Sequence, residues 1–289
     1  MSRVQRYLAG LAERITNPDA IPLYYFSEVP NVGDLLSPYI VSRVSGRPVY
    51  RMRSGRITNL CAIGSILGAA GPKSHVWGSG SIDGAPLGDR VDPARIHALR
   101  GRKTLELVRR KFDVPERMPL GDPALLTPRY FRPRAGVSHR YGIIPHVRDL
   151  DLVDGLLKRA DGHAMLVDVR KEPEAFITDL VSCEMVLSSS LHGLILADAY
   201  GIPNVWAVFS DRLRGASFKF EDYYSTTDTP DRRPLSLPGV DDEREWLSET
   251  KARADVSRYL LSGEELVDSF PEVFRSPAPE AHQTIQGGQ

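Results

Sequence analysis

One short segment carries residue types that could bind an anion and move a proton. Residues 185–203 read Met-Val-Leu-Ser-Ser-Ser-Leu-His-Gly-Leu-Ile-Leu-Ala-Asp-Ala-Tyr-Gly-Ile-Pro. This pattern predicts a strand, a hydroxyl-rich turn and a short helix that ends at a Gly-x-Pro stop. If Ser190 is the N-cap, Leu191 and His192 lie in the first helical turn. Free N–H groups and the positive end of the helix dipole favour a phosphate or carboxylate at such a turn.

The same residues also admit a purely structural explanation. Ser188 and the serines after it could do no more than cap the helix, because hydroxyl side chains commonly serve as N-caps. His192 would then be a partly buried structural histidine. In favour of chemistry, the ordinary pKa of histidine, about 6.5, suits a group that donates a proton near neutral pH. Taken alone, the residue types favour the structural explanation.

The surrounding sequence alternates apolar runs of strand length with helical patterns. This rhythm is typical of parallel sheets covered by helices, so the predicted fold class is α/β. The predicted strands are Ile21–Phe26, Leu60–Gly64, His75–Gly80, Arg95–Leu99, Arg140–Pro145, Ala164–Val169, Met185–Ser188 and Pro203–Phe209. The predicted helices are Asp34–Val44, Lys103–Phe112, Leu150–Arg159, Pro173–Val181 and Leu191–Tyr200. Ligands of such sheets gather beyond the carboxyl ends of strands, where the turn at Ser190 lies.

A Pro- and Arg-rich stretch interrupts this rhythm and marks the predicted domain boundary. Residues 127–136 read Thr-Pro-Arg-Tyr-Phe-Arg-Pro-Arg-Ala-Gly and are followed by a new strand. We therefore expect two Rossmann-like domains, residues 1–133 and 134–275. Residues 276–289 are rich in Pro, Gln and Gly and predict a disordered tail.

The charge balance argues against broad attraction to a polyanion. Lys and Arg together number 37 and so do Asp and Glu, which makes the formal net charge zero. Without an excess of positive charge we expect no nucleic-acid partner, and any anion site must be local.

The cysteines and the apolar runs favour a cytoplasmic protein. Cys61 and Cys183 each lie in an apolar run, as buried thiols do in a reducing compartment. Residues 1–15 alternate apolar and charged side chains, which predicts a surface helix and not a signal peptide. No stretch approaches the roughly 20 apolar residues that a bilayer span requires. Contact with the inner face of a membrane remains open.

The run Ser188–Ala197 belongs to a series of short motifs that occur in a recognisable order. The others are Asn31-Val-Gly-Asp34, Trp77-Gly-Ser-Gly80, Arg100-Gly-Arg-Lys-Thr104, Gly121-Asp-Pro-Ala-Leu-Leu126 and Ile144-Pro-His146. Together they resemble the polysaccharide pyruvyl transferase family, particularly its bacterial exopolysaccharide branch, over about residues 20 to 225.

The resemblance implies both a fold and a reaction. Such enzymes are similar to two-domain glycosyltransferases of the GT-B type, with two Rossmann-like domains facing a cleft. They transfer pyruvate from phosphoenolpyruvate to a hexose of an exopolysaccharide repeat unit, form a cyclic ketal and release phosphate. The acceptor implied is a lipid-linked oligosaccharide. The resemblance places the acceptor side and part of the donor site in residues 1–133, and the Ser-Leu-His-Gly donor site in residues 134–275. Phosphoenolpyruvate is a co-substrate, and we expect no further cofactor and no metal.

The resemblance also implies which residues serve phosphoenolpyruvate. They are Arg100, His192 and Lys219. Many relatives have an arginine immediately before the Leu-His pair, where this chain has Ser190. The missing guanidinium would have to come from elsewhere, and the candidates are Arg148, Arg212 and Arg214.

The remaining predicted site residues fall into two groups. Those expected near the donor are Ser189, Ser190, Leu191, Gly193, Arg148 and His146, and those expected on the acceptor side or in the cleft are Asn31, Gly33, Asp34, Gly80, Asp122, Asp211 and Tyr223. A base for the sugar hydroxyl could be Asp34, Asp122, His146 or Asp149.

Several of these residues have equally plausible structural roles. Asp34 could cap a helix at Leu35, Asp122 could hold a turn before a proline, and Arg100 could pair with Glu106 at the surface.

Residues 210–224 mix charges with aromatic side chains and could wall the sugar site, since aromatic faces suit the apolar side of a pyranose. The alternative is an ordinary surface loop. Two other functions also remain open because a fold alone does not determine a donor. One is a GT-B glycosyltransferase that uses a nucleotide-sugar, and the other is a non-catalytic partner in polysaccharide assembly.

Overall fold

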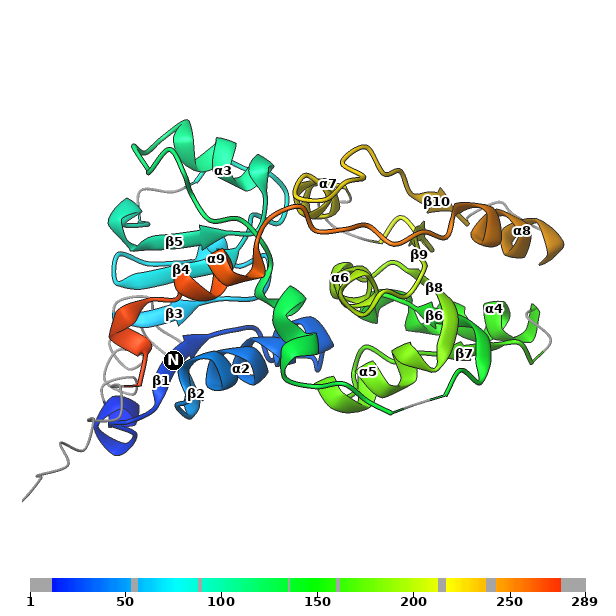
Figure 1. The fold of residues 1–289 in the computed structure, drawn as a ribbon, viewed down its shortest axis with the longest axis horizontal. Helices are drawn as coiled ribbons and strands as arrows, with labels where there is room; N and C mark the ends of the chain where they lie inside the picture. The colour runs from blue at the N-terminus through cyan, green and yellow to red at the C-terminus, as the bar shows by residue number, and fades with distance from the viewer. Residues whose placement is uncertain are drawn as a thin grey trace, which may run out of the picture.

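Two α/β units lie side by side in the computed structural model of the chain (Figure 1). The structure describes residues 12–52, 57–87, 90–134, 136–159, 162–212, 217–237 and 243–276. Each unit is built on a five-stranded sheet in which all strand pairs are parallel. The predicted α/β class is therefore confirmed. The predicted N-terminal helix lies mostly outside the described residues, as does the tail after residue 276.

The first sheet has the strand order β2-β1-β3-β4-β5. Its strands are β1 (Ile21–Tyr24), β2 (Val49–Arg51), β3 (Asn59–Cys61), β4 (Ser74–Ser79) and β5 (Ile96–Leu99). Its helices are α2 (Val32–Ser45) and α3 (Arg102–Arg109). Every residue of β3 and β4 is buried, as expected for central parallel strands covered on both faces.

The second sheet has the strand order β10-β9-β8-β6-β7. Its strands are β6 (His139–Ile144), β7 (Ala164–Leu166), β8 (Cys183–Ser188), β9 (Asn204–Val208) and β10 (Leu235–Ser236). The helices after them are α4 (Val153–Arg159), α5 (Pro173–Val181), α6 (Leu191–Tyr200), α7 (Phe218–Tyr224) and α8 (Glu243–Arg253).

Both sheets follow one topology when the strands are counted from the start of each unit. The order is 2-1-3-4-5 in each case, which is a common doubly wound arrangement. In such sheets the chain reverses its direction of winding between the first and third strands. Ligands bind outside the carboxyl ends of these two strands. The topology therefore points to the loops after β1 and β3 in the first unit and after β6 and β8 in the second.

The predicted strands are all present, and two further strands escaped prediction. These are β2 and β10, which lie at the sheet edges and are three and two residues long. Such short strands offer too few residues to show periodicity. The bounds of α5 and α6 agree with the predicted helices, whereas α2 begins two residues before the predicted Asp34.

The C-terminal segment returns to the first unit. It includes α9 (Gly263–Asp268) and the short 3-10 helix η5 (Glu272–Phe274), which pack beside β3 and β4 in Figure 1. The Trp77 indole N–H donates to the carbonyl of Leu266 at 2.8 Å, and the Trp77 ring packs edge-on against Phe270. The predicted boundary at residue 133 does separate the two sheets. The prediction also assigned this C-terminal segment to the second unit, and the structure places it on the first.

No helix among the described residues is long and apolar enough to cross a bilayer. Cys61 and Cys183 are free and buried, as predicted.

Candidate functional site

A cavity of about 580 Å³ lies where the two units meet, and residues from both units line it. The lining comes from the loops after β1, β3 and β4 in the first unit, and from those after β6 and β8 and from α7 in the second. The loops after β1, β3, β6 and β8 are those that the doubly wound topology marks. Of the predicted site residues, the cavity brings together Asn31, Gly33, Asp34, His146, Arg148, Ser190, Leu191, His192 and Lys219.

The turn between β8 and α6 presents the start of the helix to this cavity. Ser190 has the extended backbone of an N-cap, so Leu191 and His192 occupy the first turn as predicted. The Ser190 hydroxyl does not accept a hydrogen bond from that turn. Instead the Ser188 hydroxyl accepts from the Ser190 N–H at 3.0 Å and donates to the Ser190 carbonyl at 2.8 Å. The turn is thus held by Ser188, and among the described residues no side chain is seen to cap the first-turn N–H groups.

Ser189 is buried and holds the neighbouring loop instead of lining the cavity. Its hydroxyl accepts from the backbone N–H of His146 at 2.8 Å and donates to Asp149 at 3.3 Å. Asp149 in turn accepts from the Ser210 hydroxyl at 2.5 Å. Ser189 and the buried Asp149 therefore position His146, and Asp149 does not reach the cavity as a base would need to.

The Nε2 atom of His192 faces a buried carboxylate. The distance from His192 Nε2 to Asp122 Oδ2 is 3.4 Å, and the two side chains are 12% and 0% exposed. The other oxygen of Asp122 accepts from the Ala124 N–H at 3.0 Å. Asp122 does hold the turn before Pro123, but with one oxygen only. Among the described residues Oδ2 has no hydrogen-bond partner, and it points at the imidazole.

Gly33 permits the position of the His192 ring. A Cβ atom placed on Gly33 would lie 2.1 Å from His192 Nδ1, closer than any real contact. Helix α2 begins at Val32, and the Asn31 side chain caps it by accepting from the Gly33 N–H at 3.0 Å. Asp34 therefore lies in the first turn of α2 and is not the cap, because the helix starts three residues before Leu35.

Three titratable groups around the cavity have displaced pKa values, and burial is the largest cause for each. Burial raises the pKa of Asp34 to about 6, against the opposing attraction of His192 and Lys219. Burial, and then the charge of Arg100, lower the pKa of Lys219 to about 8. Burial beside Lys219 and Arg148 lowers the pKa of His146 to about 4, so its imidazole is neutral at physiological pH. Such displaced values mark sites suited to proton transfer and anion binding.

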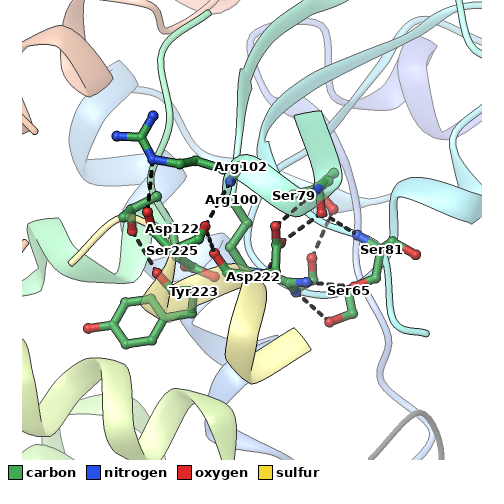
Figure 2. Close-up of polar contacts among 12 residues, drawn as sticks. Ser65, Ser79, Ser81, Arg100, Arg102, Asp122, Asp222, Tyr223 and Ser225 are labelled. Carbon is green, nitrogen blue, oxygen red and sulfur yellow. Dashed lines mark hydrogen bonds and ion pairs between the residues drawn. The ribbon is translucent and has the colours of Figure 1, made fainter. Parts of the chain in front are cut away.

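Arg100 is fully buried, and Figure 2 shows its polar contacts. Its Nε donates to Asp222 at 2.8 Å, Nη1 to the Ser65 hydroxyl at 2.6 Å and Nη2 to the Ser81 carbonyl at 2.6 Å. Asp222 also accepts from the N–H and hydroxyl of Thr104. The alternative of a surface pair with Glu106 is wrong, because the guanidinium is fully buried and its three nitrogens donate to Asp222, Ser65 and Ser81. Arg100 does not line the cavity, although Ser65 does.

The candidates for the missing arginine have different surroundings. Arg148 lines the cavity, whereas Arg212 is exposed and paired with Asp151 at 2.7 Å. Arg214 lies outside the described residues. Arg148 is therefore the described candidate that is in a position to meet a bound anion.

The prediction of an aromatic wall from residues 210–224 is wrong. The C-terminal part of this segment is helix α7, and Phe220, Tyr223 and Tyr224 are fully buried in the core. The Tyr223 hydroxyl donates to Asp198 at 2.9 Å, away from the cavity. Lys219 does line the cavity, whereas Asp211 is exposed and lies outside its lining.

Two predicted glycines serve packing. A Cβ on Gly80 would lie 2.4 Å from the Arg100 guanidinium carbon, and one on Gly193 would lie 2.5 Å from the Ser188 hydroxyl. Neither glycine lines the cavity. Each one instead lets a neighbouring side chain approach the backbone closely.

Several cavity-lining residues of the first unit were not predicted from the sequence. Phe26, Glu28, Val29, Ser65 and Ile82 line the cavity and follow strands of the first sheet. Phe26 was assigned to the predicted strand Ile21–Phe26, but β1 ends at Tyr24. Their position directly after β1, β3 and β4 could have identified them, because ligands bind beyond the carboxyl ends of parallel strands.

Comparisons with known proteins support the resemblance seen in the motifs. Residues 92–208 match the family model described as "Polysaccharide pyruvyl transferase". The chain is 29% identical over 231 residues to "Succinoglycan biosynthesis protein ExoV" of Rhizobium meliloti (strain 1021), which covers 74% of this chain and 68% of that protein. It is 27% identical over 220 residues to "Uncharacterized protein L143" of Acanthamoeba polyphaga mimivirus, which covers 73% and 75%. The resemblance to the polysaccharide pyruvyl transferase family is thereby confirmed over residues 92–208.

Proposed function

We propose that this chain, a relative of the polysaccharide pyruvyl transferases, transfers pyruvate from phosphoenolpyruvate to a hexose of an exopolysaccharide repeat unit. The products are a cyclic pyruvate ketal and phosphate. The observation that carries the proposal is a single cavity, between two doubly wound sheets, into which a histidine, a carboxylate and a lysine face together. The family match and the named role of ExoV in succinoglycan biosynthesis support the same reaction class.

The donor fits the second-unit side of this cavity. Phosphoenolpyruvate carries a phosphate and a carboxylate on three carbons, so it needs several charge-assisted donors in a small volume. Lys219, Arg148 and the first turn of α6 lie around one space. In the proposed complex they hold the two anionic groups, and Arg148 supplies the guanidinium that Ser190 does not.

The chemistry begins with a proton transfer to carbon. His192 gives its proton to the methylene carbon of the donor, and positive charge develops at the adjacent carbon. A sugar hydroxyl attacks that carbon, phosphate leaves with the electrons of the carbon–oxygen bond, and a second hydroxyl closes the ring. Of the two hydroxyl protons, one restores His192, and the other is taken up by the base and passed to the phosphate that leaves. Atoms and charge balance without a redox partner or cofactor.

Asp34 is the proposed base for the sugar hydroxyl. With a pKa of about 6 it is ionised at neutral pH and still basic enough to accept a proton. Asp122 acts on His192 from the opposite side and keeps the imidazole aimed at the cavity. The base is thus assigned to Asp34, because Asp149 is buried behind Ser189 and His146 has a pKa of about 4.

Arg100 has an indirect role in this proposal. It binds Asp222 on α7, the helix that carries Lys219, and it binds Ser65 in the cavity wall. Arg100 therefore positions two parts of the site, and we do not assign it a contact with the donor.

The wider setting completes the proposal. The arrangement of the two units is GT-B-like, and the acceptor is a lipid-linked oligosaccharide reached at the cytoplasmic face of a membrane. These assignments extend the family resemblance to this chain.

The reaction is tested by measuring phosphate release from phosphoenolpyruvate in the presence of candidate oligosaccharides. We expect release that depends on the acceptor and is abolished in His192→Ala. The matched control is His163→Ala, because His163 is an exposed histidine away from the cavity. Consumption of a nucleotide-sugar without phosphate release from phosphoenolpyruvate would contradict the proposal. Activity of His192→Ala equal to that of wild type would remove His192 from the mechanism.

A further inference from the structure

The lining of the cavity divides by chemistry between the two units. Within the described lining, the lysine, the arginine and both histidines come from the second unit. The first unit contributes the carboxylates Glu28 and Asp34 and an apolar set, Phe26, Val29, Ile66 and Ile82. One wall is therefore cationic, and the wall opposite it is apolar with negative charge.

Three apolar side chains of the first-unit wall are exposed. Phe26, Val29 and Ile82 are 44%, 43% and 45% exposed, and all three belong to this one cavity. Single exposed apolar side chains are ordinary on protein surfaces, but their gathering at the mouth of a cavity marks an interaction site.

The family resemblance implies the acceptor in the first unit, and within that unit we infer that Phe26 and Glu28 form the sugar subsite: a pyranose ring lies against Phe26 while Glu28 accepts hydrogen bonds from its hydroxyls. This inference rests on the proposed function. Phe26, Val29 and Ile82 are the specificity-determining residues of the subsite. The donor occupies the opposite wall.

Charge complementarity selects the occupant of each wall. A donor with a phosphate and a carboxylate is repelled by Glu28 and Asp34 and attracted by Lys219 and Arg148. A neutral sugar experiences neither strong effect, and its ring has an apolar face for an aromatic side chain and hydroxyls for a carboxylate. The first-unit wall therefore fits a pyranose better than it fits phosphoenolpyruvate.

The size of the cavity allows both substrates at once. Its volume of about 580 Å³ is well beyond what a three-carbon donor fills. Ligand sites of drug-sized molecules occupy roughly 300–1,000 Å³. The space left beside the donor suits one sugar ring, and the rest of an oligosaccharide would extend out past the exposed rim.

Asp34 lies at the junction of the two walls. It belongs to the first-unit wall, and its charge interacts with His192 and Lys219 across the cavity. A sugar hydroxyl beside Asp34 would thus be next to the donor bound by the second unit. This is the place where an acceptor must meet the carbon that it attacks.

Both rim segments are anchored from behind, which favours a preformed subsite. Arg51 donates to the carbonyl of Tyr25, directly before Phe26, at 3.3 Å. Arg100 donates to the carbonyl of Ser81, directly before Ile82, at 2.6 Å. Anchored walls bind ligand without first being ordered, so less affinity is lost.

The test uses saturation-transfer NMR with methyl glycosides of glucose, galactose, mannose and N-acetylglucosamine, each in the presence of phosphoenolpyruvate. We expect at least one glycoside to bind wild type and to bind Phe26→Ala about tenfold more weakly, a loss of about 1.4 kcal/mol. The matched control is Val273→Ala, which removes an exposed apolar side chain on η5, 57% exposed and outside the cavity. This control should bind as wild type does.

Phosphoenolpyruvate binding, measured alone by calorimetry, distinguishes a failure of the proposed function from a failure of the acceptor subsite. If wild type does not bind phosphoenolpyruvate, the proposed function fails. If phosphoenolpyruvate binds, but no glycoside binds or Phe26→Ala binds each glycoside as wild type does, the acceptor subsite is wrong. A loss of sedimentation with phosphatidylglycerol vesicles in Phe26→Ala, with glycoside binding unchanged, would show that the rim contacts a membrane and would also overturn the inference.

Discussion

His192 has its role determined by two neighbours that come from the other unit. Gly33 leaves space for the ring, and Asp122 faces Nε2 at 3.4 Å. With Nε2 directed to a buried carboxylate, Nδ1 is the nitrogen that lies on the side of the α2 start and the cavity. The lone histidine of the sequence is therefore part of a group of residues that only the folded chain assembles.

Asp122→Asn tests the role of the carboxylate in isolation. Asparagine keeps an oxygen for the Ala124 N–H and loses the charge that faces His192. We expect kcat to fall about tenfold to a hundredfold, a part of what a general acid contributes, with the KM for phosphoenolpyruvate nearly unchanged.

Asp92→Asn is the matched control, because Asp92 caps an Asp-Pro-Ala turn in the same way and lies outside the cavity. It should leave kcat unaltered. An unaltered kcat in Asp122→Asn would show that the carboxylate serves the turn alone.

The pKa values of Asp34 and Lys219 predict the pH dependence of kcat/KM. Asp34 must be ionised to act as a base, so activity should fall as the pH decreases through about 6. Lys219 must be protonated to hold the donor, so activity should fall as the pH rises through about 8. The profile of kcat/KM reports groups of the free enzyme, which is the state described by these values.

Lys219→Arg tests whether deprotonation of Lys219 causes the fall in activity at alkaline pH. An arginine stays charged across this range, so the part of the alkaline decline that Lys219 causes should disappear, and the part that the general acid His192 causes should remain. Activity is measured from pH 5 to pH 10 for both proteins. An alkaline limb at the same pH in the variant would assign it to another group.

At the scale of elements, the site is made by the starts of two helices that face each other. Helix α2 begins after β1 in the first unit, and α6 begins after β8 in the second. Both starts follow strands at the switch points of their sheets. The cavity therefore depends on the register of α2 against α6.

Gly33→Ala tests this close approach. The new Cβ would lie 2.1 Å from His192 Nδ1, so either the ring or the start of α2 must move. We expect kcat to fall by about a hundredfold or more, the effect of misplacing a reacting group by about 1 Å. Near-UV and far-UV circular dichroism should show that the fold is retained.

Gly155→Ala is the control for the backbone effect of the same change. Nothing lies within 4 Å of a Cβ at Gly155, which is in α4. This variant should have the activity of wild type. Equal activity in Gly33→Ala would show that His192 does not need its observed position.

The sequence allowed some elements to be predicted and concealed others. Helix α6 was predicted with its bounds, because a serine N-cap and a Gly-x-Pro stop enclose it. Helix α7 was read as a loop, although Phe220, Tyr223 and Tyr224 follow the three- and four-residue spacing of a buried helical face. Its charged residues suggested a binding role, whereas its aromatic residues face the core.

The pairing of Arg100 could not be predicted for a different reason. Its partner Asp222 is 122 residues away in the chain, and no local pattern reports a contact between two units. The packing of α9 and η5 on the first sheet is hidden in the same way. The switch-point loops, by contrast, follow from the order of strands, so the location of the cavity was more predictable than its residues.

At the scale of the whole molecule, the two units are joined by buried contacts as well as by the chain. The ion pair of Arg100 with Asp222 is 0% exposed at both side chains and links β5 to α7. The returning C-terminal segment adds the contact of Phe270 with Trp77 in the first unit. The two units are therefore joined by a buried ion pair in addition to the chain.

Asp222→Ala tests this connection. Removing one member of a buried pair leaves the Arg100 charge without compensation, so we expect the free energy of unfolding to fall by about 3–5 kcal/mol. Affinity for phosphoenolpyruvate should also fall, since α7 carries Lys219. Urea denaturation and calorimetry measure the two effects.

Glu249→Ala is the control, because its pair with Arg253 on α8 is at the surface, with side chains that are 45% and 47% exposed. Such surface pairs contribute roughly 0–1 kcal/mol. A similarly small loss in Asp222→Ala would show that the buried pair does not hold the units together.

Mass spectrometry of candidate lipid-linked oligosaccharides, incubated in deuterated water with the protein and phosphoenolpyruvate, tests the central claim most directly. The account predicts an oligosaccharide that has gained the mass of pyruvate less water, with one deuterium in the new methyl group because its added proton comes from an exchangeable donor. Phosphate should be released in equal amount, and His192→Ala should give no product. Transfer of a sugar in place of pyruvate, or a pyruvyl product without deuterium, would contradict the account.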